Sequence, residues 1–425
     1  MGLCCRLIDE FLGSRGSDGS LTIIFTTRST RKGSETLSTL EKHLAKHGPL
    51  KSERQIYFQP ENVELTSLLS VRSLCRKLLS SDLSHLDAIV LNAGIGAWSG
   101  LNWPLCLWTV LTGIRQATTW PTFKLGFVGL VTKPQFPEET PTREEPLLGE
   151  VFCANVFGHY MLAHWLMPLL QACSPESPGK IIWSSSIEVD RHHYNPDDHQ
   201  GLRSDAAYEA SKRLTDYLAL TAQEPAAASQ VKSFTTPSDS MRPDRRRPQQ
   251  SDPVSYVVQP GICTTTIISL YWIIHECYRL GIYLARWCGG PWSNVTSYLG
   301  AAAHAWLVLT SPAEINTRGA EAAGELGGPC KWGSACDRLG RSSVRVTDVP
   351  GWGINGTGKP FKDRWWGGRL GRKTGSLDAT KEDVEEFVAE GVEVWKKMEA
   401  TRQDWEARIE EYEARSGKYT NSHLL

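Results

Sequence analysis

The chain has 425 residues, enough for one large domain or two ordinary ones. Its formal net charge of −1 gives no sign of nucleic-acid binding. Eleven cysteines without CxxC pairs argue against a disulfide framework or a zinc site, and favour free thiols in a reducing compartment. The first residues lack the charged start and long apolar core of a secretory signal, and their apolar spacing predicts an amphipathic helix.

Strands and helices alternate through the next eighty residues. Apolar runs predict strands over residues 21–29, 55–59 and 86–94, and the segments between them predict helices over residues 34–47 and 64–80. This alternation favours an α/β fold, a doubly wound parallel sheet of the Rossmann type. We expect this catalytic domain to span residues 1–266.

Two insertions are expected within that domain. Residues 97–147 are rich in Trp, Pro and Leu, follow no simple period, and are expected to lie over the ligand edge of the sheet. The second insertion covers about residues 232–253, of which residues 235–253 are rich in Pro and Arg and low in apolar residues, which predicts a disordered surface segment. Between and after the insertions, helices are predicted over residues 149–172 and 205–222, and strands over residues 179–189 and 254–266.

The last third of the chain divides into an apolar segment, residues 267–310, and a C-terminal extension, residues 311–425. Residues 267–288 are apolar, but the charged side chains among them, such as Glu276 and Arg286, are costly in a hydrocarbon core. An interfacial helix in the membrane surface is therefore predicted, with a buried helix in a hydrophobic substrate lobe as the alternative. The extension predicts one long amphipathic helix over about residues 379–415.

A candidate pair for proton transfer lies on the predicted helix over residues 205–222. Tyr208 and Lys212 are four residues apart, which places them on one helix face. Reduction of a ketone needs a proton donor, and a nearby ammonium group lowers the pKa of a tyrosine that serves as one. Tyr and Lys at this spacing occur by chance in many helices, so the pair needs support from other residues.

Other residues supply this support, and together with them the chain resembles the short-chain dehydrogenase/reductase family. Asn155, Ser186 and the run Asn92-Ala93-Gly94 stand in the family's order along the chain. The resemblance implies that Tyr208 donates the proton and that Lys212 lowers its pKa and holds the cofactor ribose. It also implies that Ser186 orients the substrate carbonyl, that Asn155 completes a proton relay, and that the NAG run steadies the central sheet.

The same resemblance implies a nicotinamide cofactor. Basic residues after the family's second strand accept the extra phosphate of NADP, so Arg28, Ser29 and Arg31 favour NADP(H) over NAD. Glu64 matches an acidic position near the adenine. The segment with Pro260, Gly261 and Thr265 matches the one that borders the nicotinamide carboxamide.

Residues 58–71, 92–104, 283–292 and 331–340 resemble the fungal 3-keto-steroid reductases of ergosterol synthesis. This implies NADPH-dependent reduction of a sterol 3-ketone to the 3β-hydroxyl during C4 demethylation. It also implies a place on the cytosolic face of the endoplasmic reticulum membrane, or on lipid droplets, beside the other C4-demethylation enzymes. Two alternatives stay open: a reductase of another triterpenoid or steroid-like ketone, and a catalytically dead scaffold in a sterol-enzyme complex.

The chain departs from the family pattern at its start. Members open with a strand and a TGxxxGxG loop, whereas residues 1–3 here run straight into the helix, so we expect the sheet to lack that strand and loop. A polar loop carries His192, His193 and His199, but its pattern alone is that of a solvated loop, and no metal site is expected.

Overall fold

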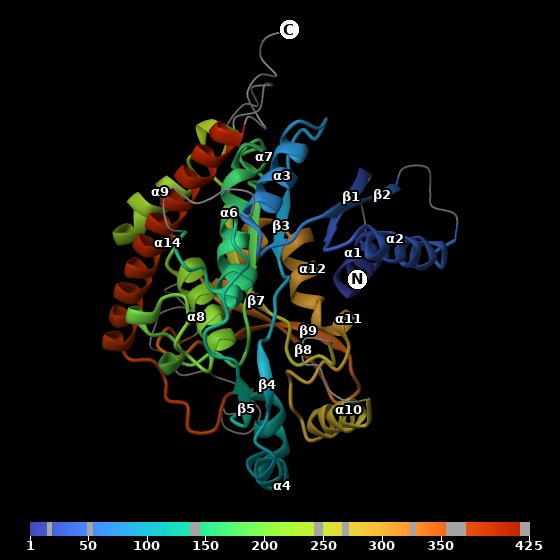
Figure 1. The fold of residues 1–425 in the computed structure, drawn as a ribbon. Coiled ribbons are helices and arrows are strands. Elements are labelled where there is room, and N and C mark those ends of the chain that lie inside the picture. Colours follow the sequence, from blue (N-terminus) through green and yellow to red (C-terminus); the bar gives the residue numbers. More distant parts are fainter. Residues whose placement is uncertain are drawn as a thin grey trace.

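A computed structural model gives the structure of the protein and describes residues 1–14, 19–48, 54–136, 145–241, 250–265, 272–323, 329–353 and 371–416. Its main sheet has five strands in the order β3, β6, β7, β8, β9 (Figure 1). They are β3 (Ala88–Leu91), β6 (Lys180–Ser184), β7 (Val254–Gln259), β8 (Lys331–Cys336) and β9 (Ser342–Thr347). The first four are parallel, and β9 pairs antiparallel with β8.

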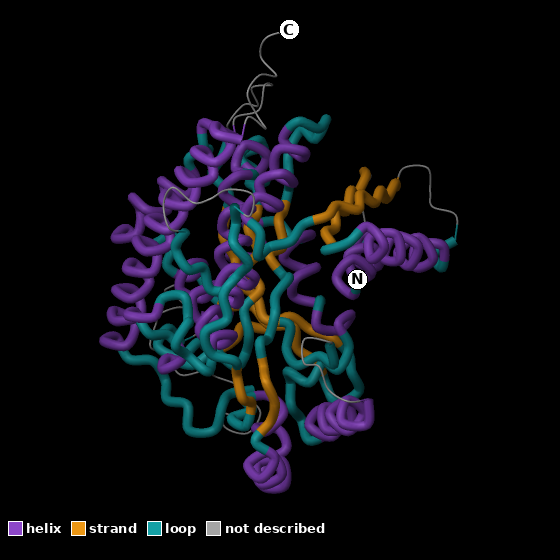
Figure 2. Tube along the Cα trace, in the orientation of Figure 1, coloured by secondary structure: helices purple, strands orange, loops and turns teal. Residues whose placement is uncertain are grey.

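Helices cover both faces of this sheet (Figure 2). The helix α8 (Ala207–Leu220) packs on β6 and β7, and α12 (Ala302–Leu309) packs on β6, β7, β8 and β9. All residues of β6 and β8 are buried as a result, including the Lys and Ser residues that each strand contains. The predicted α/β, doubly wound arrangement is therefore confirmed.

A second, two-stranded sheet stands beside the main one (Figure 1). In it β1 (Gly19–Thr27) pairs in parallel with β2 (Arg54–Asn62). The helices α1 (Gly2–Gly13) and α2 (Thr30–Ala45) share a core with β1 and with Ala305 of α12. Within the described ranges no ladder joins β1 to β3.

The predicted helix over residues 149–172 is one helical stretch with a change of winding. It consists of α5 (Glu150–Phe152), a π-helix (Cys153–Phe157), α6 (Gly158–Trp165) and α7 (Met167–Leu170). With α3 (Leu68–Leu79) it forms the largest apolar core of the molecule. The extra residue of a π-turn rotates the following side chains, which matters because Asn155 lies within it.

The insertion over residues 97–147 contains regular elements that sequence analysis did not predict. They are β4 (Trp98–Leu101), α4 (Trp103–Thr119) and β5 (Lys124–Gly126), with β4 and β5 forming an antiparallel pair. Gly113, at φ −171° and ψ 73°, interrupts α4 and so breaks its hydrophobic period. Residues 137–144 of the insertion lie outside the described residues.

The second predicted insertion begins inside a helix. Residues 232–235 belong to α9 (Ala228–Thr235), and a 3-10 turn follows at Asp239–Met241. Residues 242–249, on which the prediction of disorder chiefly rests, lie outside the described residues. Shorter 3-10 turns lie at Arg191–His193, Pro196–Asp198 and Pro225–Ala227.

The apolar segment forms α10 (Trp272–Trp287), followed by α11 (Ser297–Gly300), α12 and α13 (Pro312–Ala323). Among the helices that the structure describes, none combines the length and apolarity that crossing a bilayer requires. Residues 266–271, the start of the predicted interfacial helix, lie outside the described ranges.

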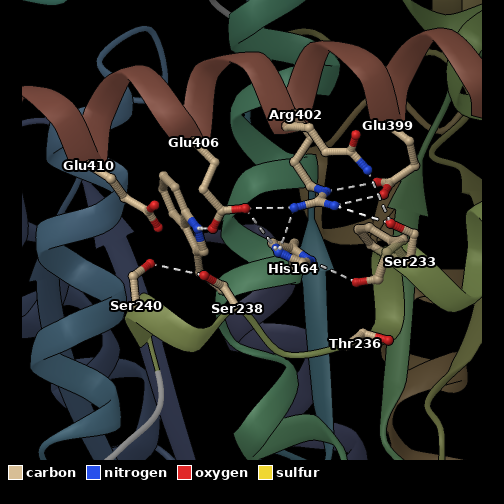
Figure 3. Close-up of polar contacts among 12 residues, drawn as sticks. His164, Ser233, Thr236, Ser238, Ser240, Glu399, Arg402, Glu406 and Glu410 are labelled. Atoms are coloured by element: carbon tan, nitrogen blue, oxygen red, sulfur yellow. Dashed lines mark hydrogen bonds and ion pairs between the residues drawn. The ribbon is translucent and has the colours of Figure 1, made fainter.

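The predicted C-terminal helix is present as α14 (Lys381–Ser416), which packs on α8 and α9. Its inner face carries ion pairs as well as apolar side chains (Figure 3). Arg402 lies between Glu399 and Glu406, with its guanidinium nitrogens 2.8 and 2.6 Å from their carboxylate oxygens. His164 of α6 accepts a 3.2 Å hydrogen bond from Arg402, so the network crosses between helices.

Candidate active site

Three predicted site segments meet where parallel strands end. Asn92-Ala93-Gly94 follows β3, Ser186 follows β6, and Pro260-Gly261 follows β7. Carboxyl ends of neighbouring parallel strands share one edge of a sheet, where α/β proteins bind ligands. At Gly261, φ is +67°, and an added Cβ would lie 2.5 Å from the Trp292 carbonyl oxygen, so this close turn requires glycine.

Asn155 fixes the loop after β3. Its Oδ1 accepts a 2.8 Å hydrogen bond from the Ile95 N–H, and its Nδ2 donates to the Ile95 carbonyl and to Ser211 Oγ, both at 3.0 Å. A Cβ on Gly94 would lie 2.6 Å from Asn155 Oδ1, so a side chain there would break this contact. Asn155 thus ties the loop to α8, and the relay role implied by the resemblance remains a prediction.

His159 supports the same loop and was not predicted. It lies one helical turn after Asn155, and its Nε2 is 2.8 Å from the Ala93 carbonyl oxygen. Burial lowers the pKa of His159 to about 4, so the ring is neutral and Nε2–H donates. His159 follows Asn155 by four residues, and this spacing is the signal from which its role could have been predicted.

The structure brings Ser186, Tyr208 and Lys212 together. Lys212 Nζ lies 5.7 Å from the centre of the Tyr208 ring and donates a 2.7 Å hydrogen bond to the Ser184 carbonyl. A hydrogen bond from Ser186 lowers the pKa of Tyr208. Ser186, to which the resemblance gives the role of orienting the carbonyl, is therefore beside the tyrosine, while the hydroxyls of its neighbours Ser184 and Ser185 point to His304 and the Lys212 carbonyl.

The net pKa of Tyr208 is nevertheless raised. Burial is the largest cause, followed by the charges of Glu188 and Glu209, and these outweigh the hydrogen bond from Ser186. Lys212 is not among the causes that set this pKa here, and its expected lowering of the pKa of Tyr208 stays a prediction. Burial lowers the pKa of Lys212 itself to about 8, with Asp216 opposing the shift and Lys331 adding to it.

Lys124, from β5 of the insertion, holds the two carboxylates near Tyr208. Its Nζ is 2.5 Å from Glu209 Oε1 and also pairs with Glu188. The same atom lies 4.3 Å from the centre of the Trp98 ring, which packs at a 58° tilt against the Tyr208 ring, with 4.9 Å between the ring centres. The insertion therefore reaches the site, as predicted, but no sequence pattern marked Lys124.

A buried ion pair lies behind Lys212. Lys331 Nζ is 2.8 Å from Asp216 Oδ2 and also donates to Ser185 Oγ and the Ser186 carbonyl, at 3.0 and 2.7 Å. It thereby fixes the serine loop against α8. Asp216 follows Lys212 by one helical turn, a spacing from which it could have been predicted.

An apolar cluster adjoins the serine loop. Ile187, Ile262 and Trp292 form its buried part, with Trp120 and Tyr278 packed against it. Trp120 Nε1 donates a 3.0 Å hydrogen bond to the Ile187 carbonyl. The charges of Glu188 and Lys124 bear on the pKa of Tyr278, so α10 reaches the same place as the insertion.

Comparison with known proteins identifies the family. The chain is 43% identical to the 3-keto-steroid reductase erg27 of Aspergillus fumigatus, over 97% of this chain and 93% of that protein. It belongs to the 3-keto-steroid reductase family. The 3-keto-steroid reductase ERG27 of Gibberella zeae is 34% identical, over 94% of this chain and 90% of its own length. No protein-family model matches the sequence.

Solved structures similar to this reductase family member share little sequence with it. Salutaridine reductase from Papaver somniferum is 16% identical, covers 73% of this chain and 91% of its own, and has a TM-score of 0.37. A complex of Pseudomonas aeruginosa RhlG with NADP is 18% identical, covers 73% and 87%, and also has a TM-score of 0.37.

The residues predicted to select NADP lie on the separate sheet of this reductase. Arg28, Ser29 and Arg31 are exposed at the carboxyl end of β1. Ser29 caps α2 through the Lys32 N–H, and Arg31 pairs with Glu35. No hydrogen bond or ion pair among the described residues joins them to the Tyr208 group.

The other predicted cofactor residues follow β2 and β7. Glu64 accepts hydrogen bonds from the Thr66 N–H and hydroxyl, at 3.2 and 3.0 Å. Thr265 is exposed, and its N–H donates to the Cys263 carbonyl. Both stand near strand ends, where the family resemblance places them.

Histidines of the polar loop make local hydrogen bonds. His193 Nδ1 accepts from the Asp190 N–H at 3.0 Å, and His199 Nδ1 lies 3.1 Å from the Tyr194 hydroxyl. These contacts stabilise the loop between β6 and α8.

Proposed function

We propose that this protein reduces the 3-ketone of a sterol to the 3β-hydroxyl in sterol C4 demethylation, with NADPH as the reductant. The observation that carries the proposal is the grouping of Ser186, Tyr208 and Lys212 at the carboxyl edge of the sheet, beside an apolar cluster. A sterol presents its ketone on an apolar ring system, so it needs both features. The relatives named 3-keto-steroid reductase support this substrate class.

Each residue has a role set by its chemistry. The Tyr208 phenol, whose pKa burial raises, is protonated at neutral pH and has a proton to donate to the carbonyl oxygen as negative charge develops there. The Ser186 hydroxyl donates a hydrogen bond to the same oxygen. Bound reduced nicotinamide supplies the hydride. The Lys212 ammonium has the Ser184 carbonyl as its partner among the described residues, which leaves N–H groups to hold a ribose hydroxyl.

The residues present fit a dinucleotide. At Gly94 and Gly261 the space that a Cβ would need is filled by Asn155 and by the Trp292 carbonyl, which hold the turns after β3 and β7 in place at the ligand edge of the sheet. Arg28 and Arg31 offer exposed guanidinium groups after β1, which suit the 2′-phosphate of NADP.

The test is NADPH oxidation by the 425-residue protein in detergent with a 3-keto sterol. Tyr208→Phe removes the proton donor and should lower kcat/KM by at least about a hundredfold. Tyr57→Phe, at a tyrosine exposed on β2, should leave it unchanged. Turnover only with another triterpenoid or steroid-like ketone would change the substrate assignment. A folded protein inactive with every ketone would favour the scaffold role.

We also propose that the protein works on the cytosolic face of the endoplasmic reticulum membrane or on lipid droplets, beside the other C4-demethylation enzymes. The support is an exposed apolar surface on α4 and α10, which pack against each other at one end of the molecule (Figure 1). Large apolar side chains are exposed there: Trp103, Leu107, Trp108 and Leu111 on α4, and Trp272, Ile273, Leu280, Leu284 and Trp287 on α10. Tryptophan and leucine on one face suit the lipid interface.

Vesicle flotation tests this placement. Replacing Leu107 and Leu284 by Asp should reduce the vesicle-bound fraction, because charge enters the apolar surface. Replacing Tyr57 on β2 and Leu309 at the end of α12 by Asp, both exposed and outside α4 and α10, is the matched control and should leave binding intact. Equal binding by both double variants would contradict the proposal.

A further inference from the structure

Two histidines and an aspartate converge between α1 and the end of α2, on the separate β1–β2 unit. Asp9 Oδ1 is 2.7 Å from His43 Nε2 and 2.8 Å from His47 Nε2. The other carboxylate oxygen accepts a 2.6 Å hydrogen bond from the Tyr298 hydroxyl. Among the described residues, this is the one group of three or more His, Cys, Asp or Glu side chains whose ligand atoms all lie within 4.8 Å of one another.

We propose that Asp9, His43 and His47 form a binding site for a divalent zinc-like cation. Two imidazole nitrogens and one carboxylate oxygen are a donor set typical of zinc, with the fourth position open to water. Solvent can supply that water, because the side chains of His43, His47 and Asp9 are 22, 33 and 24% exposed.

The local backbone brings the two histidines to one side. The helix α2 ends at Ala45, and the chain continues in a tighter turn in which the His47 N–H donates to the Leu44 carbonyl. His43 and His47 therefore approach Asp9 from the carboxyl end of the helix, where the helix dipole favours a cation.

The hydrogen-bonded cluster needs only a small opening to accept the ion. Zinc bonds of about 2.1 Å in tetrahedral geometry separate neighbouring ligand atoms by about 3.4 Å, roughly 0.6 Å more than the present distances. Each imidazole proton must then stand on Nδ1, leaving the Nε2 lone pair for the metal. The Tyr298 hydroxyl stays on the second carboxylate oxygen and orients it.

Both carboxylate oxygens of Asp9 face hydrogen-bonding groups, the two histidines at Oδ1 and the Tyr298 hydroxyl at the other oxygen. Nearby, Arg6 pairs with Glu10 on α1, and Lys42 of α2 and Lys46 just after it are exposed. Bound zinc would join α1 to α2.

The test is zinc titration of the metal-free full chain by calorimetry, with X-ray absorption at the zinc edge. We expect one bound zinc per chain with only N and O ligands at about 2.0–2.1 Å. His47→Gln and Asp9→Asn should each weaken binding by at least about tenfold. Asp9→Asn keeps an oxygen acceptor for both histidines, so a folded variant that loses zinc separates metal binding from hydrogen bonding.

His192→Gln is the matched control, since His192 is exposed and outside the cluster. It should bind zinc like the unmodified chain. A sulfur shell at about 2.3 Å would assign the metal to cysteines and overturn the proposal. So would zinc affinity unchanged in His47→Gln and Asp9→Asn, or no binding at all by the unmodified chain.

Discussion

Lys124 controls the charge around Tyr208. Burial opposes its ionisation, yet Glu188 and Glu209 raise its pKa, so it stays charged between them. The two carboxylates in turn raise the pKa of Tyr208. A residue from the insertion therefore sets how strongly the proton donor holds its proton.

Lys124→Met and Glu188→Gln should move the activity profile in opposite directions. Without Lys124, two uncompensated carboxylates raise the pKa of Tyr208 further, so the alkaline limb of kcat/KM moves up in pH. Glu188→Gln removes one carboxylate and should move that limb down. The pH dependence of NADPH-linked reduction measures both.

Lys133→Met serves as the control, because Lys133 is an exposed lysine of the same insertion. Its profile should match that of the unmodified protein. A common shift in both Lys124→Met and Glu188→Gln would contradict the charge balance described above.

At the residue scale, sequence analysis identified the site residues that are marked by their spacing along the chain or by their position in a predicted element. Tyr208 and Lys212 share a helix face, and Ser186 ends an apolar strand, so their grouping could be predicted. Lys124 and Lys331 could not, because each reaches the site only through long-range packing. The raised pKa of Tyr208 was also missed, since burial and two carboxylates appear only in three dimensions.

Among the elements, α14 depends most on buried charge. Arg402 is 6% exposed and joins Glu399 and Glu406. Tyr160 donates to Glu399 and Trp165 to Glu406, so both carboxylates are held by α6 as well. Removing one member of such a network leaves buried charge without its partner.

Arg402→Met should therefore lower the free energy of unfolding by about 3–5 kcal/mol. Lys396→Met is the matched control: Lys396 pairs with Glu393 on the same helix, but both are about half exposed. Exposed pairs contribute only about 0–1 kcal/mol. Urea denaturation measures the difference, and equal losses in the two variants would contradict it.

Element prediction succeeded where hydrophobic periods are regular. The helices α1 and α14 lie where they were predicted, and β3, β6 and β7 lie within their predicted ranges, whereas β8 and β9 were not predicted. The helix α4 was missed because Gly113 breaks its period, and the π-helix at Cys153–Phe157 leaves no mark in the apolar pattern.

Across the whole molecule, buried neutral histidines link stability to pH. Burial is the largest cause that lowers the pKa of His159, His193, His199 and His304, each to about 4. In the unfolded chain these rings protonate near 6.5. Their contribution is therefore complete above that value and is lost as the pH falls from about 6.5 toward 4.

The free energy of unfolding should fall steeply over this window. His159 and His304 are 4 and 2% exposed, and each contributes up to about 3 kcal/mol to the change. His159→Gln keeps an N–H donor for the Ala93 carbonyl and should flatten the dependence, whereas His192→Gln should not. Urea midpoints at about pH 7, 6 and 5 measure this, and parallel curves for all three proteins would disprove it.

The separation of the two sheets is a property of the whole molecule that the alternation of strands and helices could not predict. That alternation specifies parallel strands and their helices but not whether two neighbouring strands meet. The residues after β1 and those after β3 were therefore predicted as one cofactor site, yet they lie on different sheets.

The path of α14 has a consequence for how the protein is made. Arg72 bonds Glu413 across 341 residues, and Trp165 bonds Glu406 across 241. During synthesis, α3 and α6 leave the ribosome long before the helix that covers them. The surfaces of α3 and α6 that contact α14 stay exposed until α14 has been synthesised. Contacts between residues so far apart in sequence also form slowly. During this interval of translation, the exposed surface makes the nascent chain prone to misassembly.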